Sequence, residues 1–232
     1  ALNTYVMVTK EPLKDIFSED LKLPESLGIY LEDLLEEWED VRQGAQVTVG
    51  ALMSQYYNRN ETLCVPMLEI SDEEEKPQIR GFYVLFGLQP MGELTLQEGE
   101  QLMLLQNERK RYAFTMQDGT RFSLEQVQTE RKITAAEDEA GNKYPLLTVI
   151  VRGNSTVSAL SWSEDRESSK QQGKRELADQ LLTFLIMQQK KAGMDVANSF
   201  LLLAGQERSL WEQYREDPAQ YLSDLKIRLF VK

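Results

Sequence analysis

The sequence predicts an α+β protein with an antiparallel, β-rich core of barrel or sandwich type, an N-terminal amphipathic helix and a C-terminal helical region. Three observations support this fold class. Apolar residues follow a helical period near the N-terminus, short strand-like runs between turn residues recur through the middle, and the helical period returns after residue 175. We expect the first strand and helix in residues 1–45, the β-rich core in 46–165, and a helical region packed on that core in 166–232.

The N-terminal segment predicts a short strand at residues 5–8 and then a long helix. The apolar side chains of the helix recur at helical spacing and form one stripe: Leu27, Leu31, Leu34, Leu35, Trp38 and Val41. Pro24 suits the first turn of a helix, and Gly44 is a typical C-terminal stop. We therefore expect the helix over residues 24–43.

The middle of the chain predicts a series of short strands. They are expected at residues 47–49, 52–57, 62–70, 81–87, 93–96, 101–107, 111–116, 121–124, 132–135, 144–152 and 156–162. The turns Asp118-Gly119 and Ala140-Gly141-Asn142 each predict a hairpin. Residues 146–151 are apolar on both faces, which predicts a central strand. The strand count, followed by a helix at 174–192, resembles a pleckstrin-homology-type barrel closed by its C-terminal helix, and this resemblance implies a binding module.

The C-terminal third predicts a polar linker at residues 163–175 and then helices. One is expected through residue 192, a second capped by Asp195, and a third around residues 210–214. Asp217 followed by Pro218 is typical of the start of a short fourth helix. Apolar and polar residues alternate at the end of the chain, which predicts a closing strand at residues 227–231.

Composition narrows the classes of function. The 232 residues carry a net charge of −12, include no histidine and contain a single cysteine, Cys64. Without histidine, Ser-His and Cys-His nucleophiles and imidazole metal ligands are excluded. We therefore expect a protein that is not an enzyme and has no cofactor or metal. No apolar stretch approaches about 18 residues, and the N-terminus lacks signal-peptide features. These observations predict no membrane span and a cytoplasmic protein.

Acidic side chains accumulate on the expected first helix, where like charges at helical spacing repel one another. The acidic surface has two interpretations, the solvated side of a docked helix or a docking surface for a protein partner with a basic surface. We expect an intracellular adaptor, assembly chaperone or regulatory subunit. Its candidate partner-binding residues are Glu32, Asp33, Glu36, Glu37, Asp40 and, in the C-terminal helices, Trp211.

Two alternatives remain open. The first is a histidine-independent enzyme that uses carboxylates or lysine. The second is an RNA-binding module on the expected hairpin at residues 109–122, where bases and an aromatic residue form a patch: Arg109, Lys110, Arg111, Tyr112 and Arg121. Alternating aromatic residues are also typical of a strand core, and the net negative charge opposes nucleic-acid binding.

Overall fold

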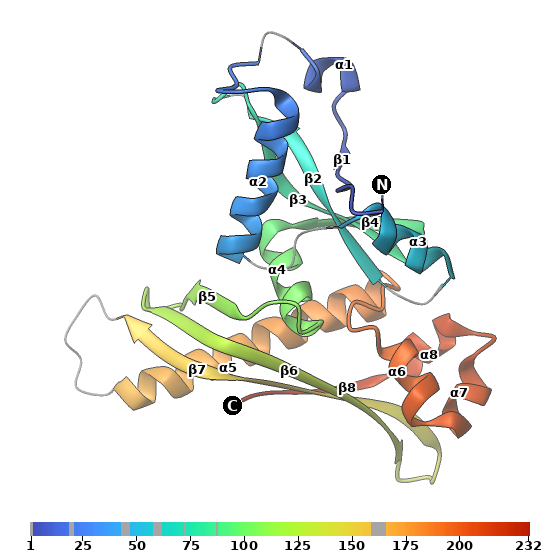
Figure 1. Ribbon diagram of the computed structural model, residues 1–232. Helices are drawn as coiled ribbons and strands as arrows, with labels where there is room; N and C mark the ends of the chain where they lie inside the picture. Colours follow the sequence, from blue (N-terminus) through green and yellow to red (C-terminus); the bar gives the residue numbers. More distant parts are fainter. Residues whose placement is uncertain are drawn as a thin grey trace. The chain divides into compact units, whose positions relative to one another are not determined.

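The computed structural model describes residues 2–18, 21–42, 47–57, 62–71, 73–86, 88–158 and 166–232. The chain divides into two compact units, residues 1–100 and 101–232 (Figure 1). Each unit contains one four-stranded sheet, and neither sheet closes on itself. The mixed helix and sheet class is therefore confirmed, whereas the barrel or sandwich architecture is not. The expected limits of the N-terminal segment, the β-rich core and the C-terminal region, near residues 45 and 165, stay a prediction.

The N-terminal unit combines short helices with a sheet of order β1-β2-β3-β4. Only the β1–β2 pair is parallel. Its elements are β1 (Val8–Thr9), α1 (Leu13–Ile16), α2 (Leu27–Arg42), α3 (Val49–Tyr57), β2 (Thr62–Ile70), β3 (Pro77–Phe86), β4 (Gln89–Thr95) and the start of α4 (Leu96–Leu105).

The described part of the apolar stripe of α2 packs on this sheet, as the helical spacing predicts. Leu35 on α2 is buried in a cluster with Leu68 on β2 and Ile79 on β3. The hydroxyl of Tyr30 donates a hydrogen bond of 3.1 Å to the backbone oxygen of Pro77. The helix is therefore fixed to the sheet by apolar burial and by one polar contact.

Two segments expected as strands are helices. Residues 52–57 belong to α3, whose start is capped by Thr48, since its hydroxyl accepts a hydrogen bond from the Ala51 N–H at 3.2 Å. Residues 101–105 belong to α4, which begins with a reciprocal capping box. The Glu98 carboxylate accepts from the Thr95 N–H at 2.9 Å, and the Thr95 hydroxyl accepts from the Glu98 N–H at 3.2 Å. These caps outweigh the β-like composition of the segments.

The C-terminal unit has a sheet of order β5-β6-β7-β8 with helices around it. The β5–β6 and β6–β7 pairs are antiparallel and the β7–β8 pair is parallel. Besides the end of α4, its elements are β5 (Arg111–Thr115), β6 (Arg121–Glu137), β7 (Lys143–Ser158), α5 (Arg166–Leu185), the π-helix η1 (Ile186–Lys191), α6 (Ser199–Gln206), α7 (Arg208–Tyr214), α8 (Pro218–Asp224) and β8 (Lys226–Val231).

Most of the expected elements of this unit are confirmed. Both predicted hairpin turns are present, with Gly119 at φ 83° and Gly141 at φ 79°. The apolar run at 146–151 lies in β7, between β6 and β8, and is central as expected. Asp217 caps α8 by accepting a hydrogen bond of 2.9 Å from the Gln220 N–H.

Other expected boundaries in this unit are wrong. The strands expected at 121–124 and 132–135 are one continuous β6, which contains a register shift between Glu125 and Gln128. The strands expected at 144–152 and 156–162 join in β7, as far as Ser158. Residues 166–175, expected as part of a linker, form the first half of α5, because Gly173 and Leu177 give this polar segment a buried side.

The sheet of the C-terminal unit has one buried and one open face. Helix α5 packs along β7 and β8 and α6 along β6 (Figure 1). Phe122, Leu147, Val149 and Val151 on the covered face are 0% exposed. A Cβ atom added at Gly173 would come within 2.1 Å of the Phe122 ring, so α5 approaches the sheet as closely as glycine permits.

Candidate interaction surfaces

The described part of the acidic surface on α2 faces solvent. Glu32, Asp33 and Glu36 are exposed, whereas Leu35 on the opposite side of the helix is 1% exposed. The pKa of Glu25 is raised, first by partial desolvation and then by the charge of Asp33 and a hydrogen bond with it. The side chains of Glu37 and Asp40 lie outside the described residues. The three described acids are accessible to a partner, and their role in binding stays a prediction.

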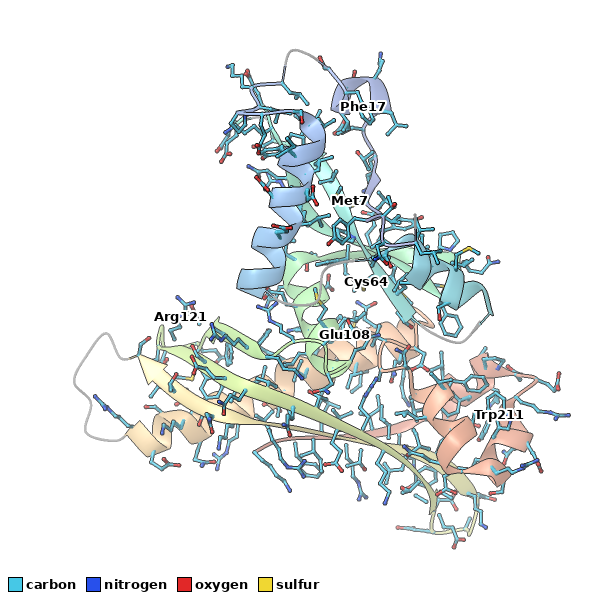
Figure 2. All side chains as sticks on the ribbon, in the orientation of Figure 1. Met7, Phe17, Cys64, Glu108, Arg121 and Trp211 are labelled. Carbon is cyan, nitrogen blue, oxygen red and sulfur yellow. The ribbon has the colours of Figure 1, made fainter. Side chains whose placement is uncertain are left out.

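Trp211 belongs to an aromatic cluster that joins the C-terminal helices. Its ring centroid lies 4.8 Å from that of Phe200 on α6 (Figure 2). Phe200 in turn lies 5.1 Å from Tyr221, and Tyr221 lies 5.8 Å from Tyr214. Trp211 is half-buried. It therefore packs α7 on α6 and leaves part of its ring at the surface, where a partner contact stays a prediction.

Some side chains of the basic hairpin at residues 109–122 are buried and others are exposed. Arg109 and Tyr112 are 7% and 2% exposed. The Nε of Arg109 donates to the backbone oxygen of Arg111 at 2.6 Å, and its guanidinium lies 5.7 Å from the centroid of the Tyr112 ring. Lys110, Arg111 and Arg121 are exposed. Because Tyr112 is buried, its ring is not accessible for stacking on a base.

A buried polar cluster holds the start of α6. The carboxylate of Asp195, 1% exposed, accepts hydrogen bonds from the N–H groups of Ser199 and Phe200 at 2.9 and 2.7 Å and from the Gln189 side chain at 3.0 Å. Burial raises the pKa of Asp195, whereas these hydrogen bonds lower it. The sequence predicts Asp195 as the cap of this helix, and its side chain does accept from the first two N–H groups, although the N-cap position itself is Asn198. The contact with Gln189 depends on the fold and has no local sequence signal.

The described residues contain neither a metal-binding cluster nor a membrane-spanning helix. No group of three or more acidic or cysteine side chains among them is arranged to hold a metal ion. No helix in the same ranges has the length and apolar character needed to cross a membrane.

Comparison with known proteins gives two likenesses. Residues 1–70 match the family described as "Spore germination protein N-terminal domain", and the match ends at the last residue of β2. The whole chain superposes on 68% of the chain in a structure entitled "Crystal Structure of the GerBC protein", with a TM-score of 0.71 and 13% sequence identity. At 13% identity, the likeness to the GerBC structure shows a similar fold and nothing further. No curated protein matches the sequence.

These likenesses correct the functional interpretation of the sequence. The interpretation as a cytoplasmic adaptor or assembly chaperone is wrong, because the N-terminal match is to a spore germination domain and the fold is that of the GerBC protein. The expected cytoplasmic localisation is wrong on the same findings. The prediction of a cytoplasmic location rests on the lack of a long apolar stretch and of signal-peptide features, and neither observation determines cellular location, which explains the error.

Proposed function

We propose that this chain is part of a membrane-associated subunit of a spore germinant receptor, of the GerAC/GerBC kind. The observation that carries this proposal is the match of residues 1–70 to the spore germination domain. The likeness of the entire chain to the GerBC fold supports it independently, because that comparison rests on the backbone and the sequence identity is only 13%.

A receptor subunit functions through contacts with other proteins of its complex. The acidic residues Glu32, Asp33 and Glu36 on α2 are our proposed contact for a basic surface of a neighbouring subunit. They are exposed on a helix whose other side is fixed to the sheet through Leu35. Charges on a rigid element increase the association rate and the specificity of a contact more than its affinity.

Germination of spores that lack the gene for this chain tests the proposed function. Mutant and parent spores are exposed to a panel of amino acids, sugars and nucleosides, and germination is followed by loss of refractility. We expect the response to at least one germinant to be lost and then restored by the reintroduced gene. Spore yield and heat resistance are the controls and should not change. An unchanged response to every germinant that the parent recognises contradicts the proposal.

The contact on α2 is tested in the same spores by replacing Glu32 and Glu36 with glutamine. We expect less of the other receptor subunits to co-purify with this variant from detergent-solubilised spore membranes, and the difference from the parent should narrow at high salt, which screens the charged contact of the parent. The control is Glu139→Gln, which removes an exposed acid from the β6–β7 turn. Equal recovery of the subunits with both variants would show that the acidic surface faces solvent and does not contact a partner.

A further inference from the structure

The open face of the C-terminal sheet is basic, although the chain as a whole is strongly acidic. Side chains on this face alternate with the buried ones along each strand, and the register of the four strands places them together. Its exposed bases are Arg111 on β5, Arg121 and Lys132 on β6, Arg152 on β7, Lys226 and Arg228 on β8, and Lys232 after it. Among the described residues, the acids on the same face are Glu125 and Glu130, and Asp138 in the β6–β7 turn interacts electrostatically with Lys226.

These charges contrast with the composition of the molecule. The chain has 38 acidic and 26 basic residues. Glu125 lies opposite Arg111 in the β5–β6 register, and Glu130 accepts a hydrogen bond of 2.6 Å from Arg152. That bond lowers the pKa of Glu130, and the charges of Lys132 and Lys232 lower it further. Both acids therefore lie beside bases, and the face has a net positive charge.

An apolar pair lies among the bases. Phe230 on β8 is 47% exposed, and Ile150 is its partner in the β7–β8 register. In the neighbouring row, Lys132, Thr148 and Arg228 follow one another across three strands. Adjacent strands are about 4.8 Å apart, so the two bases of this row flank the centre of the sheet at a spacing of about 10 Å.

Protection of an edge strand does not explain this distribution. Charged side chains on an edge strand prevent pairing with other chains, and this accounts for the bases on the edge strands β5 and β8. It does not account for Arg121, Lys132 and Arg152, which lie on β6 and β7, the two central strands of the sheet. Recognition of RNA on a sheet uses exposed rings for stacking. On this face the ammonium group of Lys226 lies 3.8 Å from the centroid of the half-buried Tyr144 ring. Phe230 is then the one exposed ring among the described residues of the face, whereas sheets that recognise RNA stack two or three bases on their rings.

We propose that this open sheet face docks on the surface of an anionic lipid bilayer. The inference rests on the proposed membrane-associated function and names the part of the chain that meets the membrane. Each lysine or arginine close to an anionic bilayer increases binding by a factor of about five. Apolar side chains such as Trp, Phe and Leu insert at the boundary between the lipid headgroups and the acyl chains when a basic surface docks there, which suits Phe230. The acidic remainder of the chain is repelled by the same bilayer, which favours contact through this face over other surfaces of the unit.

Vesicle co-sedimentation of the full chain tests this proposal. Vesicles of phosphatidylcholine mixed with phosphatidylglycerol are compared with vesicles of phosphatidylcholine alone over a series of salt concentrations. We expect binding only to the vesicles that contain phosphatidylglycerol, and weaker binding as salt screens the charges. Equal binding to both vesicle types, or binding that salt does not change, would overturn the proposal.

Paired variants assign the binding to the face. Lys132→Gln combined with Arg228→Gln should lower vesicle binding about 25-fold, a factor of about five for each base. The control combines Arg175→Gln on α5 with Arg208→Gln on α7, which are exposed bases away from the open face. It should bind within about twofold of the parent chain, because only charges close to the bilayer contribute. Equal losses in the two double variants would show that net charge, and not the sheet face, governs binding.

Two further results bear on the choice of ligand. If single-stranded RNA or an acidic polypeptide displaces the chain from anionic vesicles and itself binds through Lys132 and Arg228 more tightly, the lipid assignment is overturned. Failure of the vesicle experiment leaves the germination phenotype of the gene deletion unaffected. The docking face and the receptor function are therefore tested separately.

Discussion

The carboxylate of Asp195 accepts from the first N–H groups of α6, which have no partner within the helix. The Ser199 hydroxyl donates to the same carboxylate at 2.7 Å, and the Nη1 atom of Arg131 donates to the Ala197 oxygen at 2.7 Å. All of these groups are buried or partly buried. Loss of one acceptor therefore leaves several donors without hydrogen bonds in a site that excludes most water.

Replacement of Asp195 by alanine should reduce the free energy of unfolding by about 2–3 kcal/mol, through the lost cap and the unpaired buried donors. Asp195→Asn keeps one acceptor oxygen and should lose less. Urea unfolding measures both, and Asp179→Ala on the exposed side of α5 is the matched control, expected within about 0.5 kcal/mol of the parent. Equal stability of the Asp195 and Asp179 variants would contradict the structural role.

Ionisation of Tyr214 should make the stability of the folded chain depend on pH in the alkaline range. Burial of its phenol, and then its hydrogen bond of 2.9 Å to Asp224, raise its pKa to about 12. The ordinary value is about 10. A folded-state pKa above the unfolded value contributes stability that is fully present below about pH 10 and is lost as pH rises through about 12.

Tyr214→Phe should therefore flatten the loss of stability between about pH 10 and 12, at the expense of the hydrogen bond at neutral pH. Phenolate absorbance measures the ionisation directly, and one tyrosine with a raised pKa should be missing from the titration of the variant. Burial also raises the pKa of Tyr221, so that phenol should still ionise late. Titration of every tyrosine of the parent chain close to pH 10 is the contrary outcome.

At the scale of secondary structure, two glycines on helices differ in the space around them: Gly173 is crowded and Gly28 is open. Alanine is favoured over glycine inside a helix by about 0.5–1 kcal/mol. A Cβ atom at Gly173 on α5 would lie 2.1 Å from the ring of Phe122, which is fully buried and packs 5.5 Å from Phe114. A Cβ atom at Gly28 on α2 would have no neighbouring atom within 4 Å.

We expect opposite effects of the same substitution at these two positions. Gly173→Ala should reduce the free energy of unfolding by about 1–3 kcal/mol, because overpacking against Phe122 outweighs the helix propensity. Gly28→Ala should increase it by up to about 1 kcal/mol. Thermal unfolding of both variants measures the difference. A stabilising effect at both positions would show that α5 moves away from the sheet without cost.

The elements also show how far the sequence determines the fold. Asp118-Gly119 and Gly141 fix both hairpins locally, so the turns of the C-terminal sheet are predictable from the sequence. The capping box of Thr95 and Glu98 is also a local signal, and it indicates the helix α4 where apolar composition alone suggests a strand. Sheet closure has no such signal. It depends on which edge strands pair, and β8 returns from the end of the chain to lie parallel to β7.

The candidate surfaces differ in the same way. The acids of α2 are close in sequence, so their common side of a helix follows from the 3.6-residue period. The bases of the open sheet face lie on four strands that extend from residue 111 to residue 232, and only the register brings Lys132 and Arg228 into one row. The alternation of Lys226, Arg228 and Lys232 is the local part of the signal. It indicates one basic side of a strand, and the neighbouring strands supply the rest.

At the scale of the whole molecule, the charge is both large and unevenly distributed. The net charge is −12 and the open sheet face is positive, so the remaining surface is more acidic than the total indicates. Repulsion among these acids destabilises the compact state. Ion pairs oppose this effect, but those of Lys10 with Glu93 and Arg208 with Glu212 are exposed, and exposed pairs contribute about 0–1 kcal/mol each.

Added salt should therefore stabilise the full chain. Salt screens the long-range repulsion among the acids and also the attraction within the exposed ion pairs, and the repulsion is the stronger of the two effects. A gain of 1 kcal/mol corresponds to a rise of about 2–4 °C in Tm for a chain of this length. Calorimetry in increasing sodium chloride measures the rise in Tm. Sucrose at matched osmolality is the control, because it is excluded from the protein surface but does not screen charges. A Tm that falls with salt would mean that the exposed pairs outweigh the repulsion, and the acidic surface would then be a balanced network.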